Sequence, residues 1–475
     1  MMQFQSVNSI FAVLCVANVI SYVFRNLVPA SPLEFQTFIQ RTLHIPAAST
    51  SVYFGLLESI FIVSYCLSIL VFGYLSKTIA PLRLLAVGLS LWCASVVLCG
   101  LASPANNFYI LLIGRLLSGI GDSAVQAITP PFLERYAATN RKNLWLGIFY
   151  GAIPLGTALS YFVGSFVTRL AGWQVAFYMC ALFMAPLVGI CTTCIPDQWN
   201  QPLTDPASAT TTTPPSSISS DVWSVLRSPI FLTSSLGGSA FAWVFVSMAT
   251  FGPSILIGAG TFPDHWAATV FGVTVLVCGV LGSVLGGILL DRASVKASHE
   301  CIDDSTRLTA ACYQQLVLVA AGLPFLVLTS ICLDSPVGII LCLILGLTFT
   351  FATLNATTMA ILLSVPPALQ GLAVGLFSNI VHWVGDVPAP LVVGVIKDWY
   401  APGCGSTQGP DGVDQVDPAC ASDANRLGLK MTLFWATLWL TWSAVLWFAS
   451  WRLAKKQGQP IQVVYLEERN EPPRV

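Results

Sequence analysis

The sequence predicts an all-α membrane protein with twelve transmembrane helices, arranged as two six-helix, pseudo-symmetric bundles. Hydrophobic residues make up 55% of the 475 residues and charged residues only 9%, whereas a soluble domain carries roughly a quarter charged residues. Twelve apolar runs are each long enough to cross a bilayer, which takes a helix of about 20 residues. A polar stretch rich in Pro, Ser and Thr separates the first six runs from the last six.

Charged residues, Pro, Gly and Asn mark the ends of the predicted spans. The longest apolar stretch is divided at Pro366 and Pro367, because proline lacks the backbone donor that a continuous helix needs. The predicted spans cover residues 7–28, 51–73, 84–102, 108–129, 143–168, 173–195, 229–251, 267–290, 311–333, 337–363, 371–396 and 428–451.

The polar stretch between the sixth and seventh spans buries too little apolar surface to order itself, so it is predicted to be a linker. The predicted domains are therefore an amino-terminal bundle, a linker, a carboxy-terminal bundle and a tail, which cover residues 1–195, 196–227, 228–452 and 453–475. A second polar loop, residues 399–426, contains Cys404 and Cys420. These two cysteines are predicted either to form a disulfide or to remain free, because nothing in the sequence fixes their geometry.

The distribution of basic residues predicts the orientation. With both termini in the cytoplasm, fourteen of the 21 Lys and Arg residues fall on the cytoplasmic side, five on the other, and Arg25 and Arg115 within spans. Cytoplasmic loops retain positive charge. We therefore expect both termini and the linker to be cytoplasmic.

Ionisable residues well inside predicted spans are the main candidates for function, since a charge at that depth is costly unless it faces a cavity or a partner. They are Arg25, Glu58, Arg115, Asp122 and Asp386. Arg25 is the best candidate to bind an anionic headgroup, because guanidinium binds phosphate through paired donors and keeps its charge. Glu58 and Asp122 are expected to neutralise Arg25 when no substrate is bound.

Three of these residues also have a structural interpretation. Arg115 would brace the cytoplasmic helix ends, and the sequence favours this reading over a binding role. Asp122, seven residues or about two turns away, would be the buried partner of Arg115. Glu58 would lie nearer the outer face than the site.

His382 precedes Asp386 by four residues and so shares its helical face. The pair either takes part in substrate binding or proton coupling, or forms a hydrogen-bonded pair between helices. Neutral polar residues in the spans, Asn18, Tyr22 and Asn355, would either donate to a headgroup or serve helix packing at about 1 kcal/mol each. Pro154 in the fifth span is predicted to be a hinge or close-contact residue.

One short motif occurs twice, at the same place in each half. GYLSKT (73–78) follows the second span and GILLDR (287–292) the eighth. In the second copy Gly287 is expected to let helices approach closely. Asp291 and Arg292 are expected to pair with neighbouring helix ends and to latch the cytoplasmic side, whereas the first copy has Lys77 and Thr78 there.

The twelve-span plan, GILLDR, and RLLSGIG (115–121) with its Gly119 and Gly121 resemble the major facilitator superfamily. More narrowly, the chain resembles the Spinster branch. The segments that carry this resemblance are CVANVISYVFRN in the first span, GRLLSGIGDSAVQAITPPFLERY in the fourth, IFYGAIPLGTALSYFVG in the fifth and SNIVHWVGDVPAPLVVGVIKD in the eleventh.

The resemblance implies the major facilitator fold and a secondary transporter that works by alternating access. It also implies an amphiphilic lipid substrate, a lysophospholipid or a sphingolipid such as sphingosine phosphate, and a location in the plasma membrane or in a lysosome or vacuole-like organelle. The family pattern has an acid before its first-span Arg, and this chain has Phe24 there. The resemblance implies proton coupling, but the carboxylate that the family uses for it is missing here.

Other chemistries find no support in the sequence. The four His residues, at 44, 265, 299 and 382, have no metal-ligand spacing, and no Walker-type phosphate loop is present. We expect no enzymatic activity, cofactor, metal or nucleic-acid partner, and we expect a monomer. Two rival functions remain: a carrier of small organic anions, and a transport-inactive receptor or scaffold.

Overall fold

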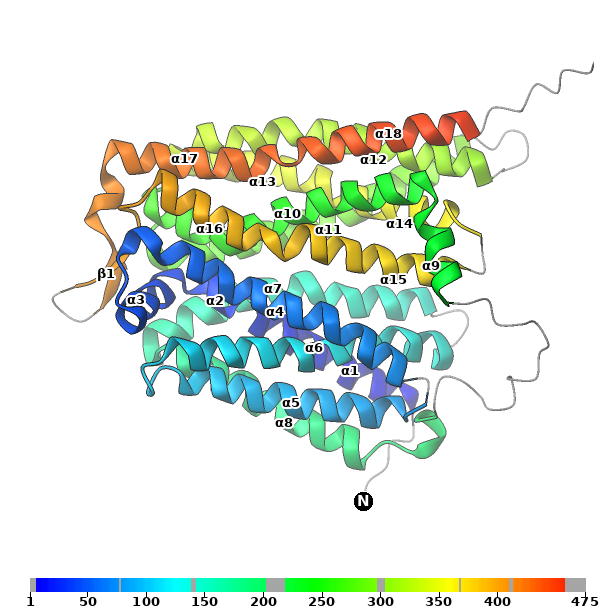
Figure 1. Cartoon of the computed structure of the whole chain (residues 1–475), viewed down its shortest axis with the longest axis horizontal. Helices are drawn as coiled ribbons and strands as arrows, with labels where there is room; N and C mark the ends of the chain where they lie inside the picture. The colour runs from blue at the N-terminus through cyan, green and yellow to red at the C-terminus, as the bar shows by residue number, and fades with distance from the viewer. Residues whose placement is uncertain are drawn as a thin grey trace, which may run out of the picture.

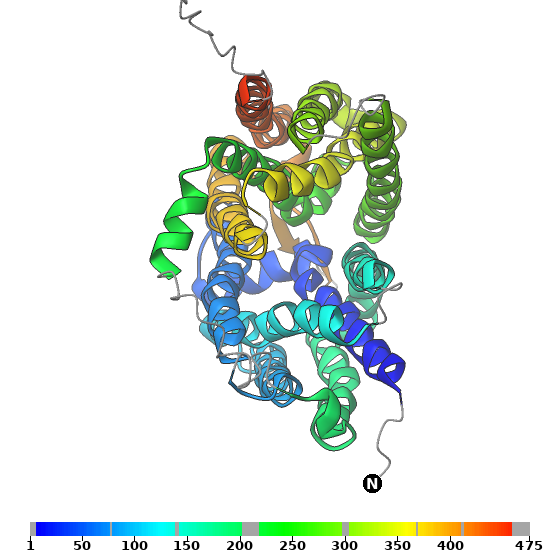
Figure 2. The same cartoon turned by 90° about the vertical axis from the view of Figure 1, so that its right-hand side faces the viewer.

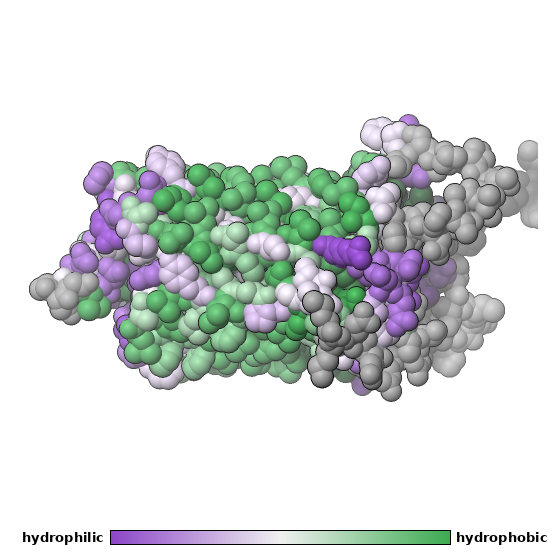
Figure 3. Space-filling view, turned by 90° about the horizontal axis from the view of Figure 1, so that it is seen from below, coloured by the Kyte–Doolittle hydropathy of each residue, from purple (hydrophilic) through white to green (hydrophobic). Residues whose placement is uncertain are grey.

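The computed structural model describes residues 6–76, 78–137, 142–201, 218–296, 304–366, 369–409 and 413–457. Within them, twelve helical spans are long and apolar enough to cross a membrane. The surface agrees with this, because a broad apolar belt covers the middle of the molecule and polar residues lie at both ends (Figure 3). The prediction of a twelve-helix, all-α membrane protein is confirmed.

The first six spans form one bundle. They are α1 (Val7–Arg25), α4 (Thr50–Leu75), α5 (Pro81–Leu101), α6 (Phe108–Tyr136), α7 (Lys142–Ala171) and α8 (Trp173–Thr193). Two short helices, α2 (Leu27–Ala30) and α3 (Pro32–Leu43), connect α1 to α4. Neither was predicted.

The last six spans form the second bundle, and three of them are divided. The undivided spans are α10 (Pro229–Gly258), α11 (Asp264–Lys296) and α12 (Asp304–Ile331). The tenth span consists of α13 (Pro336–Phe351) and α14 (Thr353–Leu363), the eleventh of α15 (Gln370–Ile380), the π-helical segment η6 (Val381–Asp386) and α16 (Pro388–Tyr400), and the twelfth of α17 (Asp423–Leu438) and α18 (Thr441–Gln457). Figure 2 shows the two bundles as separate groups of helices, one in blue to cyan-green and the other in green to red.

The linker region contains a helix that the composition did not predict. Helix α9 (Ile218–Leu226) occupies its last part, while residues 202–217 lie outside the described residues. Val225 of α9 is fully buried in a small apolar cluster with Phe231 and Ile361 of the second bundle. This packing explains why the segment is ordered in spite of its polar surroundings.

The loop between α16 and α17 is held by a disulfide between Cys404 and Cys420. It contains an antiparallel pair of strands, β1 (Ser406–Gln408) and β2 (Asp414–Val416). Four short 3-10 helices complete the described elements: η1 (Ala47–Ser49), η2 (Asp197–Trp199), η4 (Cys332–Asp334) and η7 (Pro418–Ala421). We call the end of the molecule with this loop the disulfide end, and the opposite end, where α18 ends and α9 lies, the terminal end (Figure 1).

The two bundles touch at the disulfide end and part at the terminal end. At the disulfide end, α16 packs on α4 and α11 packs on α7. Toward the terminal end, the facing helices lose this contact, and Leu70, Val71 and Tyr74 of α4 become exposed. The molecule is therefore closed at the disulfide end and open at the terminal end.

Candidate functional site

A cavity of about 200 Å³ lies between the two bundles, and both bundles line it. Polar groups gather on its wall: Tyr22, Arg25, Asn26, Glu58, Thr157, His382 and Asp386. Ile62, Ile153, Phe241, Phe245 and Val246 form its apolar wall. A larger hollow of about 660 Å³ opens at the disulfide end, but no predicted site residue lines it.

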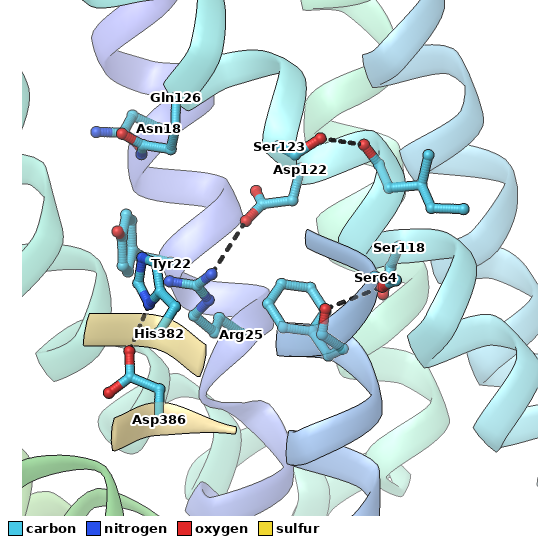
Figure 4. Close-up of polar contacts among 12 residues, drawn as sticks. Asn18, Tyr22, Arg25, Ser64, Ser118, Asp122, Ser123, Gln126, His382 and Asp386 are labelled. Carbon is cyan, nitrogen blue, oxygen red and sulfur yellow. Dashed lines mark hydrogen bonds and ion pairs between the residues drawn. The ribbon is translucent and has the colours of Figure 1, made fainter. Parts of the chain in front are cut away.

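Arg25 is the last residue of α1 and its side chain is 19% exposed. Its guanidinium lies 3.8 Å from the Asp122 carboxylate, which is longer than a hydrogen bond, and its Nε has no hydrogen-bond partner in the described part of the chain (Figure 4). Asp122 can therefore neutralise the charge of Arg25 while leaving donors free for another anion.

An aromatic ring system surrounds Arg25. Its guanidinium carbon lies 4.9 Å from the ring centres of both Phe61 and Tyr65, and 5.2 Å from that of Tyr22. Such cation–π contacts hold the cation in place without using its hydrogen-bond donors. Phe61 and Tyr65 were not predicted to belong to the site. The signal was available, because both lie on the same helical face as Glu58, at spacings of three and seven residues.

His382 and Asp386 contribute the ionisable groups of the second bundle to the cavity wall. They lie on η6, and His382 Nδ1 is 2.5 Å from Asp386 Oδ2 (Figure 4). The His382 ring packs edge-on against Tyr65, with 5.5 Å between ring centres. Because Tyr65 also contacts Arg25, this one side chain touches ionisable groups of both bundles.

Arg115 is completely buried inside the first bundle and pairs with Glu58 at 2.7 Å. Its Nε donates to the Leu57 carbonyl at 3.2 Å, and its guanidinium carbon lies 5.3 Å from the ring centre of Phe24. The prediction that Arg115 braces the cytoplasmic helix ends is therefore wrong, and so is the pairing of Asp122 with Arg115. Glu58 lines the cavity, but it forms its ion pair with Arg115 and not with Arg25.

The three predicted neutral residues separate into two groups. Tyr22 lines the cavity. Asn18 donates to the Phe149 carbonyl and accepts from Gln126, both at 2.8 Å, so it joins α1 to α6 and α7. Asn355 donates to the Ser283 carbonyl at 2.7 Å and does not line the cavity. Of the two roles predicted for Asn355, the structure shows helix packing, because its side chain holds α14 against α11.

The glycines of RLLSGIG (115–121) and of GILLDR (287–292) differ in how closely other helices approach them. A side chain at Gly119 would collide with Ser64 and the Phe61 carbonyl, and one at Gly121 would lie 2.6 Å from the Gly88 carbonyl, so α6 packs closely on α4 and α5. At Gly287 a Cβ would lie 3.7 Å from Asn355, an ordinary contact and the one found among the described residues, so the predicted close approach there is wrong. It occurs at Gly286, where a Cβ would collide with Ala352.

The other residues of the repeated motif are Lys77, Asp291 and Arg292, and few of their contacts lie within the described residues. Arg292 is exposed and forms no ion pair with another described residue. The side chain of Asp291 and all of Lys77 lie outside the described residues, as does the predicted latch that Asp291 would form. Pro154 of α7 faces Gly279 of α11, and a Cβ at Gly279 would lie 3.7 Å from that of Pro154. Within the described ranges, no three His, Cys, Asp or Glu residues are grouped so that they could hold a metal ion.

The sequence matches the Major Facilitator Superfamily over residues 13–390. Among curated relatives, it is 28% identical to a probable sphingolipid transporter, spinster homolog 2 of Arabidopsis thaliana, over 73% of this chain and 70% of that protein. It is 28% identical to protein spinster homolog 1 of Homo sapiens, over 82% of this chain and 72% of that protein. It is 24% identical to the sphingosine-1-phosphate transporter SPNS2 of Danio rerio, over 81% and 75% respectively.

Solved structures share the fold. A bacterial homolog of the human lysosomal transporter Spinster, in an inward-facing and unoccupied conformation, superposes with a TM-score of 0.74 and 16% identity. That match covers 96% of this chain and 98% of the other. The nucleoside transporter NupG is similar with a TM-score of 0.58 and 15% identity, over 94% of this chain and 99% of the other.

Proposed function

Because the chain belongs to the major facilitator superfamily, a family of membrane transporters and not of enzymes, we propose that it moves a lysophospholipid or sphingolipid-type amphiphile by alternating access. The observation that carries this proposal is Arg25, a charged residue on the wall of the cavity between the bundles, which lies 3.8 Å from Asp122 and whose Nε has no partner among the described residues. Similarity to sphingolipid transporters supports the choice of an amphiphile.

In this proposal the anionic headgroup binds Arg25, which Asp122 neutralises when the cavity is empty. A phosphate can accept two parallel hydrogen bonds from a guanidinium, and Arg25 keeps its charge at any physiological pH. Tyr22, Glu58, His382 and Asp386 line the same cavity and complete the proposed polar site. Asn18 serves this site indirectly, by fixing α1 against its neighbours.

The size of the cavity bears on the substrate. At about 200 Å³ it is smaller than typical sites for drug-sized ligands, which are roughly 300–1,000 Å³. It has room for a headgroup, and an acyl chain would extend past Phe241 and Phe245 toward the open terminal end. The same small volume is the specific observation that favours the rival function, a carrier of small organic anions.

The open terminal end is proposed to face the cytoplasm, because most Lys and Arg residues lie in its loops and in the carboxy-terminal tail. The closed disulfide end would face the outside or the lumen of a lysosome or vacuole-like organelle, where disulfides persist. One chain contains the whole cavity, which supports a monomer as the transporting unit.

Uptake by the purified protein in sealed lipid vesicles tests the function. Lysophosphatidylcholine, sphingosine phosphate and a small dicarboxylate would be compared against protein-free vesicles. We expect a lysolipid or the sphingoid phosphate to move. Uptake of the dicarboxylate alone would establish the rival carrier, and no uptake of any compound would favour a receptor or scaffold.

Because Phe24 stands where the family pattern has an acid, we make a prediction about proton coupling. Because position 24 is Phe, we expect lipid transport to respond weakly to a pH gradient across the vesicle membrane. The measurement is the initial transport rate with and without a gradient. A steep response that disappears in Asp386→Asn or His382→Ala would contradict this prediction and would move proton coupling to η6.

A further inference from the structure

At the disulfide end, a carboxylate of the second bundle binds the beginning of a helix in the first. Asp398, near the end of α16, accepts hydrogen bonds from the backbone N–H groups of Ser51 and Val52, each at 3.1 Å. These groups belong to the first turn of α4, where backbone N–H groups have no partner within the helix. The N-cap residue Ser49 provides no side-chain bond. Asp398 therefore supplies the missing cap from the other bundle.

The neighbouring residue strengthens the same contact. Lys397 is 2% exposed, and its Nζ donates to Ser51 Oγ at 3.1 Å and to the Cys404 carbonyl at 2.8 Å. The backbones also touch, because a Cβ at Gly394 would lie 2.5 Å from the Ser51 carbonyl and one at Gly55 would collide with Pro390. The Lys397 hydrogen bonds are buried and those of Asp398 are partly buried, so water has limited access to this contact.

A second ion pair joins the bundles at this end, between Arg169 of α7 and Asp264 of α11, at 2.7 Å. Its side chains are 47% and 35% exposed. An exposed pair of this kind adds little to stability, because both charges are solvated when it breaks. Separation of the bundles would instead leave the Ser51 and Val52 N–H groups of α4 without their carboxylate acceptor.

We propose that Asp398 is a gate residue: its two bonds to α4 hold the disulfide end closed, and they break when the carrier opens there. The proposal rests on the alternating access proposed above. Its energetic basis is that charge-assisted hydrogen bonds are worth more than neutral ones, and that a carboxylate is favoured at a helix N-terminus. Lys397 is assigned a positioning role, because it holds Ser51 and the disulfide loop beside Asp398.

Access to a buried cysteine behind the gate tests the proposal. Ser59 of α4 is 5% exposed and donates to the Val387 carbonyl at 2.7 Å, so Ser59→Cys places a thiol between α4 and η6. The background would have its free cysteines replaced by Ser, with the Cys404–Cys420 disulfide kept. A membrane-impermeant maleimide is added from the disulfide side, and the labelling rate is measured.

We expect Asp398→Asn to raise the labelling rate about tenfold, whereas Asp398→Glu, which keeps the charge, raises it less. Asp264→Asn is the matched control, since it breaks an exposed contact between the bundles at the same end, and it should change the rate less than about twofold. Equal labelling of Asp398→Asn and the parent protein, or an equal rise in both Asn variants, would overturn the proposal.

A change on the other side of the contact separates gating from loss of folding. Val52→Pro removes one of the two donors, and proline is tolerated in the first turn of a helix. It should raise labelling in the parent protein and add nothing in Asp398→Ala, because alanine has no side-chain acceptor and the bond is already lost. Additive effects of the two changes would count against the gate.

The labelling does not depend on transport. If the protein transports a lipid but Asp398→Asn is labelled at the parent rate, the gate alone is refuted. If Asp398→Asn changes the labelling rate but the protein transports no lipid, the proposed function alone is refuted.

Discussion

Arg25→Ala is expected to abolish transport of an anionic amphiphile while leaving the protein folded. The change removes the cavity's free cationic donors and leaves Asp122 as an unpaired acid beside the headgroup. Hydrogen bonds to charged groups are worth about 1.5–3 kcal/mol. Loss of the Arg25 guanidinium should therefore weaken headgroup binding by about 10- to 100-fold. Initial uptake rates at several lipid concentrations, with protein amounts matched by size-exclusion profile, measure this loss.

Two further variants sharpen the Arg25 result. Arg25→Lys keeps the positive charge but loses the paired donors, so transport should be reduced without being abolished. Arg83→Ala is the matched control, because Arg83 is 67% exposed and pairs with exposed Asp197, far from the cavity. Wild-type flux in Arg25→Ala would refute the headgroup role, whereas equal loss in Arg83→Ala would indicate a general effect of removing charge.

The second large effect is expected at the Glu58–Arg115 pair. Glu58→Gln leaves the Arg115 guanidinium buried without a counter-ion, and breaking a buried pair in this way costs about 3–5 kcal/mol. We expect a lower thermal unfolding temperature in detergent and a loss of transport. Asp264→Asn, which breaks an exposed pair, should lower the unfolding temperature much less.

Removing both charges distinguishes a structural from a functional role of this pair. In Glu58→Leu/Arg115→Met no buried charge is left unpaired, so stability should return to within about 1 kcal/mol of the parent protein. Transport should stay impaired, because Glu58 also lines the cavity. A stable double variant that transports at the parent rate would show that the pair serves packing only.

The sequence predicted the spans well because bilayer thickness fixes how long an apolar run must be. The predicted 84–102 and 173–195, for example, differ little from α5 and α8. It did not predict the breaks within the last three spans, or helices α2 and α3. Those depend on local backbone hydrogen bonding and on packing at the disulfide end, to which hydropathy is insensitive.

The sequence predicted which residues belong to the candidate site better than it predicted which of them form ion pairs. Burial cost alone singles out charged residues at membrane depth, and Arg25, Glu58, His382 and Asp386 do line one cavity. Which acid meets which base depends on how helices are rotated about their axes. Asp122 lies about 10 Å along α6 from Arg115, too far for contact, so each of the two residues pairs with a different neighbouring helix.

The π-helical turn that carries His382 and Asp386 has a further mechanical meaning. Such a turn holds one more residue than an α-helical turn, and each residue of an α-helix advances by about 100° around the axis. Tightening η6 would therefore swivel its acidic and imidazole groups by roughly that angle relative to α16. A small change in how the backbone of η6 is wound can thus turn His382 and Asp386 toward or away from the cavity. This motion is local, unlike the tilting of a whole bundle.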